Sequence, residues 1–269
     1  MAKTAIVMGA SRGIGRSIAQ RLAEDGFAVV VNFTRHAHQA NETAAAIIES
    51  GGQAVAIQAD ITREDEIKKL FETSLREFGR IDVVVSNVGV MALSPIARGD
   101  VETFDEIMRT NLRGAFLVFA QAAAHIADGG RIIAFSNSDA GTYPPSYGAY
   151  IASKAGVEGL AGVLANELRK RQVTVNTVAL GAAAAEHFLQ GTSGMPVGPP
   201  VNWDTAREAN DISHVVSFLA GPDGGWVSGQ VIPVTEEPLD RASLMRLRGA
   251  PVTSSTAASV HAATHAHAH

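Results

Sequence analysis

The stretch TAIVMGASRGIG, residues 4–15, joins a run of apolar residues to a turn that contains three glycines. The apolar run predicts a buried strand, and Gly9, Gly13 and Gly15 predict a turn into a helix. Glycines in such a turn let the backbone approach a pyrophosphate closely, and the helix terminus directs N–H groups at it. Glycine is also common in ordinary strand-to-helix turns, so a phosphate cradle and a plain turn both stay open.

The same alternation of a short β-rich run and a longer helical pattern continues along the chain. Further strands are expected at 27–33, 53–60, 81–87, 131–138, 173–180 and 229–234. Helices are expected at 14–25, 39–50, 64–78, 101–127, 148–170 and 205–220. Strands that alternate with helices favour parallel pairing with both faces of the sheet covered. The pattern predicts an α/β fold, a single-domain Rossmann-type doubly wound parallel seven-stranded sheet with helices on both faces.

The chain is expected to divide into one large domain and an extension. Residues 1–236 form the predicted dinucleotide-binding and catalytic domain, and 181–204, rich in Ala, Gly and Pro, form a substrate loop or lid within it. After Glu237 the periodicity fades, and the chain ends in the low-complexity run SSTAASVHAATHAHAH. We expect 237–269 to be a C-terminal extension that is mobile at its end.

Composition narrows the classes of partner. The 269 residues carry a net charge of -5 and no cluster of Lys or Arg, which argues against nucleic acid and anionic membrane surfaces. There is no cysteine, so disulfides and thiolate chemistry are excluded. The amino terminus lacks the pattern of a signal peptide, and no apolar run is long enough to span a bilayer. We expect a cytoplasmic protein that acts on a small molecule and needs no metal.

The stretch YIASK, residues 150–154, places a phenol and an ammonium one helical turn apart. Positions i and i+4 lie on one face of a helix, so Tyr150 and Lys154 are expected to project together. A nearby ammonium favours the phenolate and lowers the pKa of the phenol, which suits general acid and base catalysis. The alternative is a tyrosine that packs under the helix beside a lysine that faces solvent.

Five motifs together resemble the short-chain dehydrogenase/reductase superfamily. They are GASRGIG at 9–15, SNVG at 86–89, NLRG at 111–114, SNSDAG at 136–141 and YIASK at 150–154. The resemblance is to the classical type and its NADP-dependent 3-oxoacyl-(acyl-carrier-protein) reductase-like branch, and it covers about residues 1–235. Each motif alone is common, whereas the combination at these distances is specific.

The resemblance implies four catalytic positions. Tyr150 would be the acid and base, Lys154 would hold the nicotinamide ribose and tune the tyrosine, and Asn111 would anchor a water that passes protons on. Ser138 would orient the substrate carbonyl, but it lies twelve residues before Tyr150, one fewer than is usual in this branch. Ser136 stands close by as a rival.

The cofactor expectation is NADP(H). Relatives that use NAD carry an acid at the end of the second strand, and here that position is Phe33. Asn32, Thr34 and Arg35 surround it, and Arg12 lies in the glycine turn, so two guanidinium groups are available for a 2′-phosphate. The alternative is that both arginines are ordinary solvated surface charges.

Two polar residues at strand ends have open roles. Asp60 could accept a hydrogen bond from adenine or could cap the next helix, and Asn87 could contact the cofactor or only tie backbone together. Gly181 is expected at the cofactor beside a loop where Leu180 and Ala185 replace the proline and threonine of relatives. The full expected cofactor set is Gly9, Ser11, Arg12, Gly13, Ile14, Gly15, Asn32, Phe33, Thr34, Arg35, Asp60, Ile61, Asn87, Val88, Gly89, Tyr150, Lys154 and Gly181.

These features predict an NADPH-dependent oxidoreductase that reduces a carbonyl to an alcohol, on 3-oxoacyl thioesters or on other ketones. The alternatives are a non-catalytic NADP-binding sensor or structural member, and an alcohol dehydrogenase that works in the oxidative direction. Gly156, Gly159 and Gly162 within one expected helix suggest close packing on another element. Because the family pairs this helix across subunits, a homotetramer, or failing that a dimer, is expected.

Overall fold

The structure is a computed structural model that describes residues 2–137, 143–180 and 205–234. All of these residues belong to one compact unit, Met1–Glu236. The expected loop at 181–204 and the expected extension at 237–269 lie outside the described residues. Within the described part, no helix combines the length and the apolar character that a membrane span requires.

A single sheet of seven parallel strands forms the centre of this unit, in the order β3-β2-β1-β4-β5-β6-β7. The strands are β1 (Thr4–Met8), β2 (Ala28–Phe33), β3 (Gln53–Gln58), β4 (Val83–Ser86), β5 (Arg131–Asn137), β6 (Thr174–Leu180) and β7 (Val231–Val234). The inner strands are mainly apolar and are buried along nearly their whole length because both of their faces are covered. The predicted seven-stranded parallel α/β fold is confirmed.

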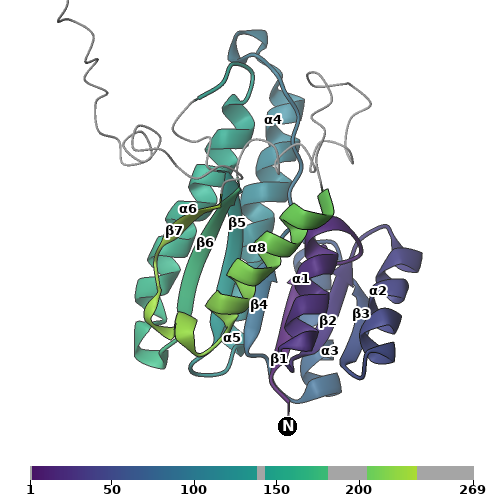
Figure 1. The fold of residues 1–269 in the computed structure, drawn as a ribbon. Coiled ribbons are helices and arrows are strands. Elements are labelled where there is room, and N and C mark those ends of the chain that lie inside the picture. The colour runs from purple at the N-terminus through teal and green to yellow at the C-terminus, as the bar shows by residue number, and fades with distance from the viewer. Residues whose placement is uncertain (1, 138–142, 181–204, 235–269) are drawn as a thin grey trace, which may run out of the picture. The chain divides into compact units, whose positions relative to one another are not determined.

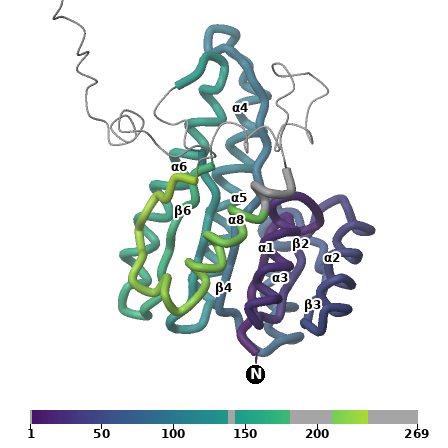
Figure 2. Tube along the Cα trace, viewed as in Figure 1, coloured from purple at the N-terminus to yellow at the C-terminus, as the bar shows by residue number. Residues whose placement is uncertain are grey.

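Helices cover both faces of the sheet (Figures 1 and 2). One face packs against α1 (Gly13–Glu24), α2 (Ala37–Glu49) and α8 (Thr205–Ala220). The other packs against α3 (Glu64–Phe78), α5 (Gly114–His125) and α6 (Gly148–Glu167). Neighbouring strand residues alternate between the two cores: Val7 contributes to the first, and Ile6 and Met8 contribute to the second.

The strand order reverses beside β1, because the chain builds β2 and β3 on one side of it and then returns to place β4 on the other. Such a reversal leaves a crevice at the carboxyl ends of the strands, where ligands bind in doubly wound folds. Met8 pairs with Ser86 in register, and Ser86 pairs with Ala134. The glycine turn after β1, the SNVG segment after β4 and the end of β5 therefore meet at one edge.

The structure differs from the expected continuous helix at 101–127. Helix α4 (Val101–Ile107) is followed by a π-helical turn, η2 (Met108–Arg113), before α5 begins at Gly114. A π-helical turn changes the direction of the side chains that it carries and is often found at functional sites. Asn111 lies within this turn. Short 3-10 turns lie at η1 (Ile96–Arg98), η4 (Arg169–Arg171) and η5 (Asp223–Trp226).

Candidate active site

The glycine turn after β1 has a backbone that only glycine accepts readily. Gly9 and Gly13 have positive φ angles of 68° and 55°. A Cβ on Gly15 would lie 2.2 Å from the carbonyl oxygen of Gly9, so a side chain cannot fit there. Arg12, the N-cap of α1, makes no side-chain hydrogen bond to the first turn of the helix. The turn is thus narrow, and the Arg12 side chain leaves the amino end of α1 uncapped.

Asn32 braces this turn from the neighbouring strand. Its Oδ1 accepts a hydrogen bond from the Gly9 N–H at 3.3 Å, and its Nδ2 donates to the carbonyls of Ile57 at 3.3 Å and Ala59 at 3.1 Å. Phe33, the next residue, is 8% exposed and belongs to the core. The Asn32 side chain is hydrogen-bonded within the protein, and the Phe33 side chain is packed in the core. A cofactor would therefore contact these two positions through their backbone atoms.

Asn87, directly after β4, supports the same turn with its Nδ2, while its Oδ1 has no hydrogen-bond partner among the described residues. Its Nδ2 donates to the Gly9 carbonyl at 3.5 Å, and a Cβ on Gly15 would lie 2.7 Å from this nitrogen. Its Oδ1 is buried and has no hydrogen-bond partner among the described residues. Buried polar atoms are rarely left unsatisfied. Asn87 therefore ties backbone together and still offers a buried acceptor to a ligand at the crevice.

Asp60 shapes the turn that leads into α3. Its Oδ1 accepts from the N–H of Thr62 at 2.9 Å and from the Thr62 hydroxyl at 2.8 Å. The N-cap of α3 is Arg63, three residues after Asp60, so the interpretation of Asp60 as the helix cap is wrong. Ile61 is buried and lies against Gly114, where a Cβ would be 2.7 Å from its Cδ1.

The two arginines expected at a 2′-phosphate are both on the surface. Arg12 lies in the glycine turn, and Arg35 follows β2. Neither forms an ion pair with another of the described residues. Two guanidinium groups beside the ends of β1 and β2 are thus available to an anion. The residues present fit the diphosphate and the 2′-phosphate of NADP(H): glycines that leave room, uncapped helix N–H groups and exposed arginines. The buried Asn87 Oδ1 suits a hydroxyl donor of the cofactor instead.

Tyr150 and Lys154 lie together at the start of α6. Tyr150 is 1% exposed and Lys154 is 3% exposed. The Lys154 Nζ is 5.8 Å from the centroid of the Tyr150 ring and donates to the Phe135 carbonyl at 3.2 Å. Burial lowers the pKa of Lys154 to about 8. The predicted shared face is confirmed, and the alternative of a solvent-facing lysine is wrong.

Asn111 links three elements around this pair. Its Oδ1 accepts from the Val90 N–H at 2.7 Å, and its Nδ2 donates to the Val90 carbonyl at 2.9 Å. The same Nδ2 donates to the Ser153 hydroxyl at 3.0 Å, and that hydroxyl donates to the Tyr150 carbonyl at 2.7 Å. The network holds η2, the segment after β4 and α6 in one arrangement. Ser153 was absent from the predicted site, although it stands inside YIASK.

Gly89 provides the room in which the lysine and the asparagine meet. A Cβ on Gly89 would lie 3.0 Å from the Lys154 Nζ and 3.5 Å from the Asn111 Oδ1. An ammonium and an amide oxygen therefore flank the same small residue, and both can bind a water or a hydroxyl placed there.

Two of the expected site residues, Ser138 and Gly181, lie outside the described residues. The rival of Ser138, Ser136, is buried in β5, on the same face of the strand as Ala134, which packs in the core beneath α6. Burial raises the pKa of Glu158, and the nearby Ser136 hydroxyl opposes that shift. The Ser136 hydroxyl is buried and has no hydrogen-bond partner among the described residues, so Ser136 stays a rival of Ser138.

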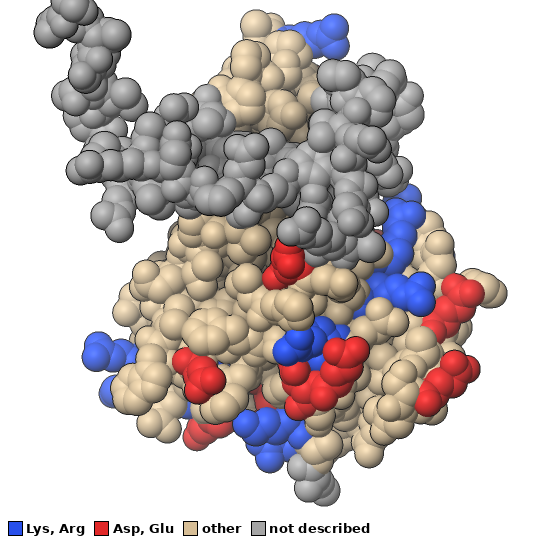
Figure 3. Space-filling model, in the orientation of Figure 1, with Lys and Arg blue, Asp and Glu red and all other residues tan. Residues whose placement is uncertain are grey.

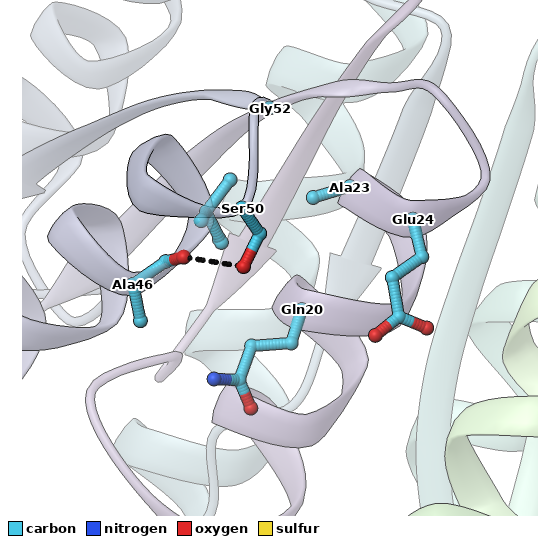
Figure 4. Close-up of a pocket in the computed structure, with 7 residues that line it drawn as sticks. Gln20, Ala23, Glu24, Ala46, Ser50 and Gly52 are labelled. Carbon is cyan, nitrogen blue, oxygen red and sulfur yellow. Dashed lines mark hydrogen bonds between the residues drawn. The ribbon is translucent and has the colours of Figure 1, made fainter.

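Two surface hollows lie away from this group. One, of about 220 Å³, lies between α1 and α2 and is lined by Gln20, Glu24, Ser50 and Gly52 among others (Figure 4). In it the Ser50 hydroxyl is turned back onto the Ala46 carbonyl at 2.9 Å. The other is formed by α1, α8 and the segment after α8. Neither contains a predicted site residue.

Comparison with known proteins agrees with this geometry. The sequence profile described as short chain dehydrogenase matches residues 3–192. The chain belongs to the short-chain dehydrogenase family. A hydroxynaphthalene reductase-like protein Arp2 of Metarhizium brunneum is 39% identical over 249 residues, which cover 87% of this chain and 93% of the relative.

Solved structures of this family have the same fold. A dehydrogenase/reductase from Sinorhizobium meliloti has a TM-score of 0.76 and 34% identity, over 87% of this chain and 93% of that one. The angucycline C-6 ketoreductase LanV, with bound NADP, has a TM-score of 0.74 and 32% identity, over 87% and 94% of the two chains. This short-chain dehydrogenase is therefore an oxidoreductase, as the motifs predicted.

Proposed function

We propose that this short-chain dehydrogenase reduces a ketone to an alcohol with NADPH, and that Tyr150 is the proton donor. The observation that carries the proposal is the buried Tyr150–Lys154 pair, held by the Asn111–Ser153 network. A protein that only bound a nucleotide could use Lys154 to hold the ribose, but it would have no need for a buried phenol beside that ammonium. The arrangement therefore supports turnover over the alternative of a non-catalytic sensor.

Each residue has a role that its chemistry allows. NADPH, when bound, supplies the hydride that reaches the carbonyl carbon. The Tyr150 hydroxyl donates its proton to the carbonyl oxygen, so the product is an alcohol and the tyrosine becomes a phenolate. The Lys154 ammonium stabilises that phenolate, and a water held at the Asn111 Oδ1 beside Gly89 returns a proton from solvent. Ser138 would hold the carbonyl by donating a hydrogen bond to its oxygen.

The preference for NADP(H) over NAD(H) is the finer part of the proposal. An apolar residue, Phe33, stands where relatives that use NAD carry an acid, so no carboxylate at that position repels a 2′-phosphate. Arg12 and Arg35 are exposed and have no ion-pair partner among the described residues. LanV is described with bound NADP, which supports the same preference here. The oxidative alternative is less well supported because the missing acid argues against NAD+.

We also propose that the protein is a cytoplasmic homotetramer. On the outer face of α5 and α6, Phe116 is 54% exposed and Val163 is 59% exposed. Gly156 packs on Leu112 of its own chain, whereas a Cβ on Gly159 or Gly162 would meet nothing within 4 Å. Exposed apolar side chains beside glycines leave a face that another helix can approach closely.

Initial-rate assays with NADPH and NADH test the proposal. The panel covers simple cyclic ketones, aromatic ketones and 3-oxoacyl thioesters, with Tyr150→Phe as the inactive reference. We expect reduction of at least one ketone class, with NADPH preferred. Equal rates with the two cofactors would contradict the cofactor part, and no turnover of any substrate in either direction would contradict the catalytic part.

A further inference from the structure

We infer that an apolar lip beside Tyr150 selects uncharged ketones that carry an aromatic or alicyclic ring. The apolar lip consists of Met91, Leu93, Ile96, Tyr143 and Tyr147. The inference rests on the proposed reductase function and specifies its substrate class. It separates ring ketones from 2-oxo acids and from 3-oxoacyl thioesters.

The inner part of the lip touches the proton donor itself. Met91, 1% exposed, and Tyr150 form one small cluster, and Leu93 and Tyr147 pack against it. This cluster is separate from the two large cores that hold the helices to the sheet. Leu93 and Tyr147 are half-buried, so the apolar surface continues outward from the buried Tyr150. A carbonyl at Tyr150 would place its substituents against this surface.

The outer part of the lip comes from two segments that are tied together. The Ser94 N–H donates to the Ser146 carbonyl at 3.0 Å. A Cβ on Gly148 would lie 3.0 Å from the Ile96 Cδ1, so Ile96 lies against the first turn of α6, close to Tyr150 in sequence. Yet Ile96 is 85% exposed, and Tyr143 is 72% exposed. Figure 1 shows the upper ends of α4 and α6, in this region, rising above the strands of the sheet.

The backbone of the second segment is strained. Tyr143 and Ser146 have positive φ angles of 46° and 73°, and neither is glycine. Such strain costs stability and is enriched at binding and catalytic sites, where the surrounding structure holds it. Here it presents an exposed tyrosine immediately before the catalytic helix, which favours a recognition role over a chance exposure.

The lip has no fixed charge. Residues 87–97 and 143–153 contain no Asp, Glu, Lys, Arg or His. The cation nearest to Tyr150 among the described residues is Lys154, which is engaged with Phe135 and the tyrosine ring. Figure 3 shows the same contrast: the projection above is mostly tan with blue at its tip, whereas blue and red groups mix over the lower half. A carboxylate held against Met91 and Leu93 would lose its hydration without an ion-pair partner from residues 87–97 or 143–153.

A matched pair of variants tests the lip. Ile96→Ser and Tyr143→Ser remove exposed apolar surface, and Ile48→Ser is the control because Ile48, on α2, is 54% exposed and distant from Tyr150 in the fold. The probes are 2-tetralone, cyclohexanone, phenylpyruvate and the acetoacetyl thioester of N-acetylcysteamine. We expect 2-tetralone to have the highest kcat/KM. Both lip variants should raise its KM by about threefold to tenfold at similar kcat, as loss of a modest apolar contact implies.

The remaining results separate the two proposals. Cyclohexanone, which is too small to span the lip, should change by less than about twofold, and Ile48→Ser should change neither ketone. A preference for phenylpyruvate or the thioester, or an equal effect of the lip variants on both ketones, would overturn the lip. Calorimetric titration of 2-tetralone into NADP+-loaded protein covers the case of no turnover. Binding weakened by Ile96→Ser would then support the lip while the reductase proposal fails, and absence of binding would end both.

Discussion

The ammonium of Lys154 occupies the space beside Gly89 so closely that a Cβ on residue 89 would be only 3.0 Å from Nζ. A Cβ at that distance forces its neighbour to move by a few tenths of an ångström. The end of a lysine side chain can yield, but this one is held by Phe135 and aligned with Tyr150. A side chain at position 89 would therefore displace the Lys154 ammonium and would affect the stability of the fold much less.

Gly89→Ala should accordingly lower kcat by about tenfold, because small displacements of a positioned group are costly in rate. The melting temperature should fall by no more than a few degrees, since the displaced atom is the end of a flexible chain. Steady-state rates and thermal unfolding of the same preparation check this. Unchanged kcat would show that the lysine position is not critical.

Tyr150→Phe removes the transferable proton and almost no volume. Turnover should fall by about 100-fold or more, the usual loss when a general acid is removed, while the affinity for NADPH is retained. Single-turnover reduction and fluorescence titration of NADPH measure the two effects separately. If this variant keeps its full rate, the proton comes from another group and the proposed mechanism is wrong.

The pKa of Lys154 gives a pH dependence of stability. Below about pH 8 the lysine is charged in the folded and unfolded chains alike, so the folded protein bears the full cost of burying the charge. Between about pH 8 and the ordinary value of 10.5, the unfolded chain binds more protons, so stability rises with pH. Relative to Lys154→Met, the wild-type free energy of unfolding should gain about 2 kcal/mol between roughly pH 7.5 and 9.5. Urea unfolding at the two pH values measures it, and a constant difference would contradict the lowered pKa.

Ser146→Gly should relieve backbone strain. Ser146 has a φ of 73°, a region that glycine adopts freely and serine does not. The variant should be more stable by about 1 kcal/mol, and Ser146→Ala, which keeps the strain, should show no gain. Chemical denaturation of the three proteins decides it. Equal destabilisation by both changes would mean that the serine side chain holds the loop.

Phe116→Glu should disrupt the proposed tetramer. A carboxylate at this exposed position on α5 would be buried without a partner when another helix covers the face. Light scattering should then show a smaller species than the wild type, and Ile48→Glu on α2 should leave the mass unchanged. A wild-type protein that is monomeric at micromolar concentration would refute the assembly itself.

The alternation of strands and helices was predictable because apolar periodicity and glycine punctuation are local properties of the sequence. The strands were placed to within one or two residues, and α3 was found at its predicted bounds, 64–78, where three acids start it and Gly79 ends it in the left-handed conformation. The Tyr150–Lys154 pair was predictable for the same reason, since positions four apart share a helix face whatever surrounds them.

Tertiary structure decided what these residues contact. The sequence could not show that the Asn32 side chain is fully hydrogen-bonded to Gly9, Ile57 and Ala59, because those partners lie after β1 and along the end of β3, far from Asn32 in sequence. Nor could it show the π-helical turn that carries Asn111 to Val90 and Ser153, since its pattern of apolar residues resembles an ordinary helix. Local pattern determines which elements form, whereas hydrogen bonds between elements depend on the order in which the sheet brings them together. That order placed β1, β4 and β5 side by side and so assembled the site.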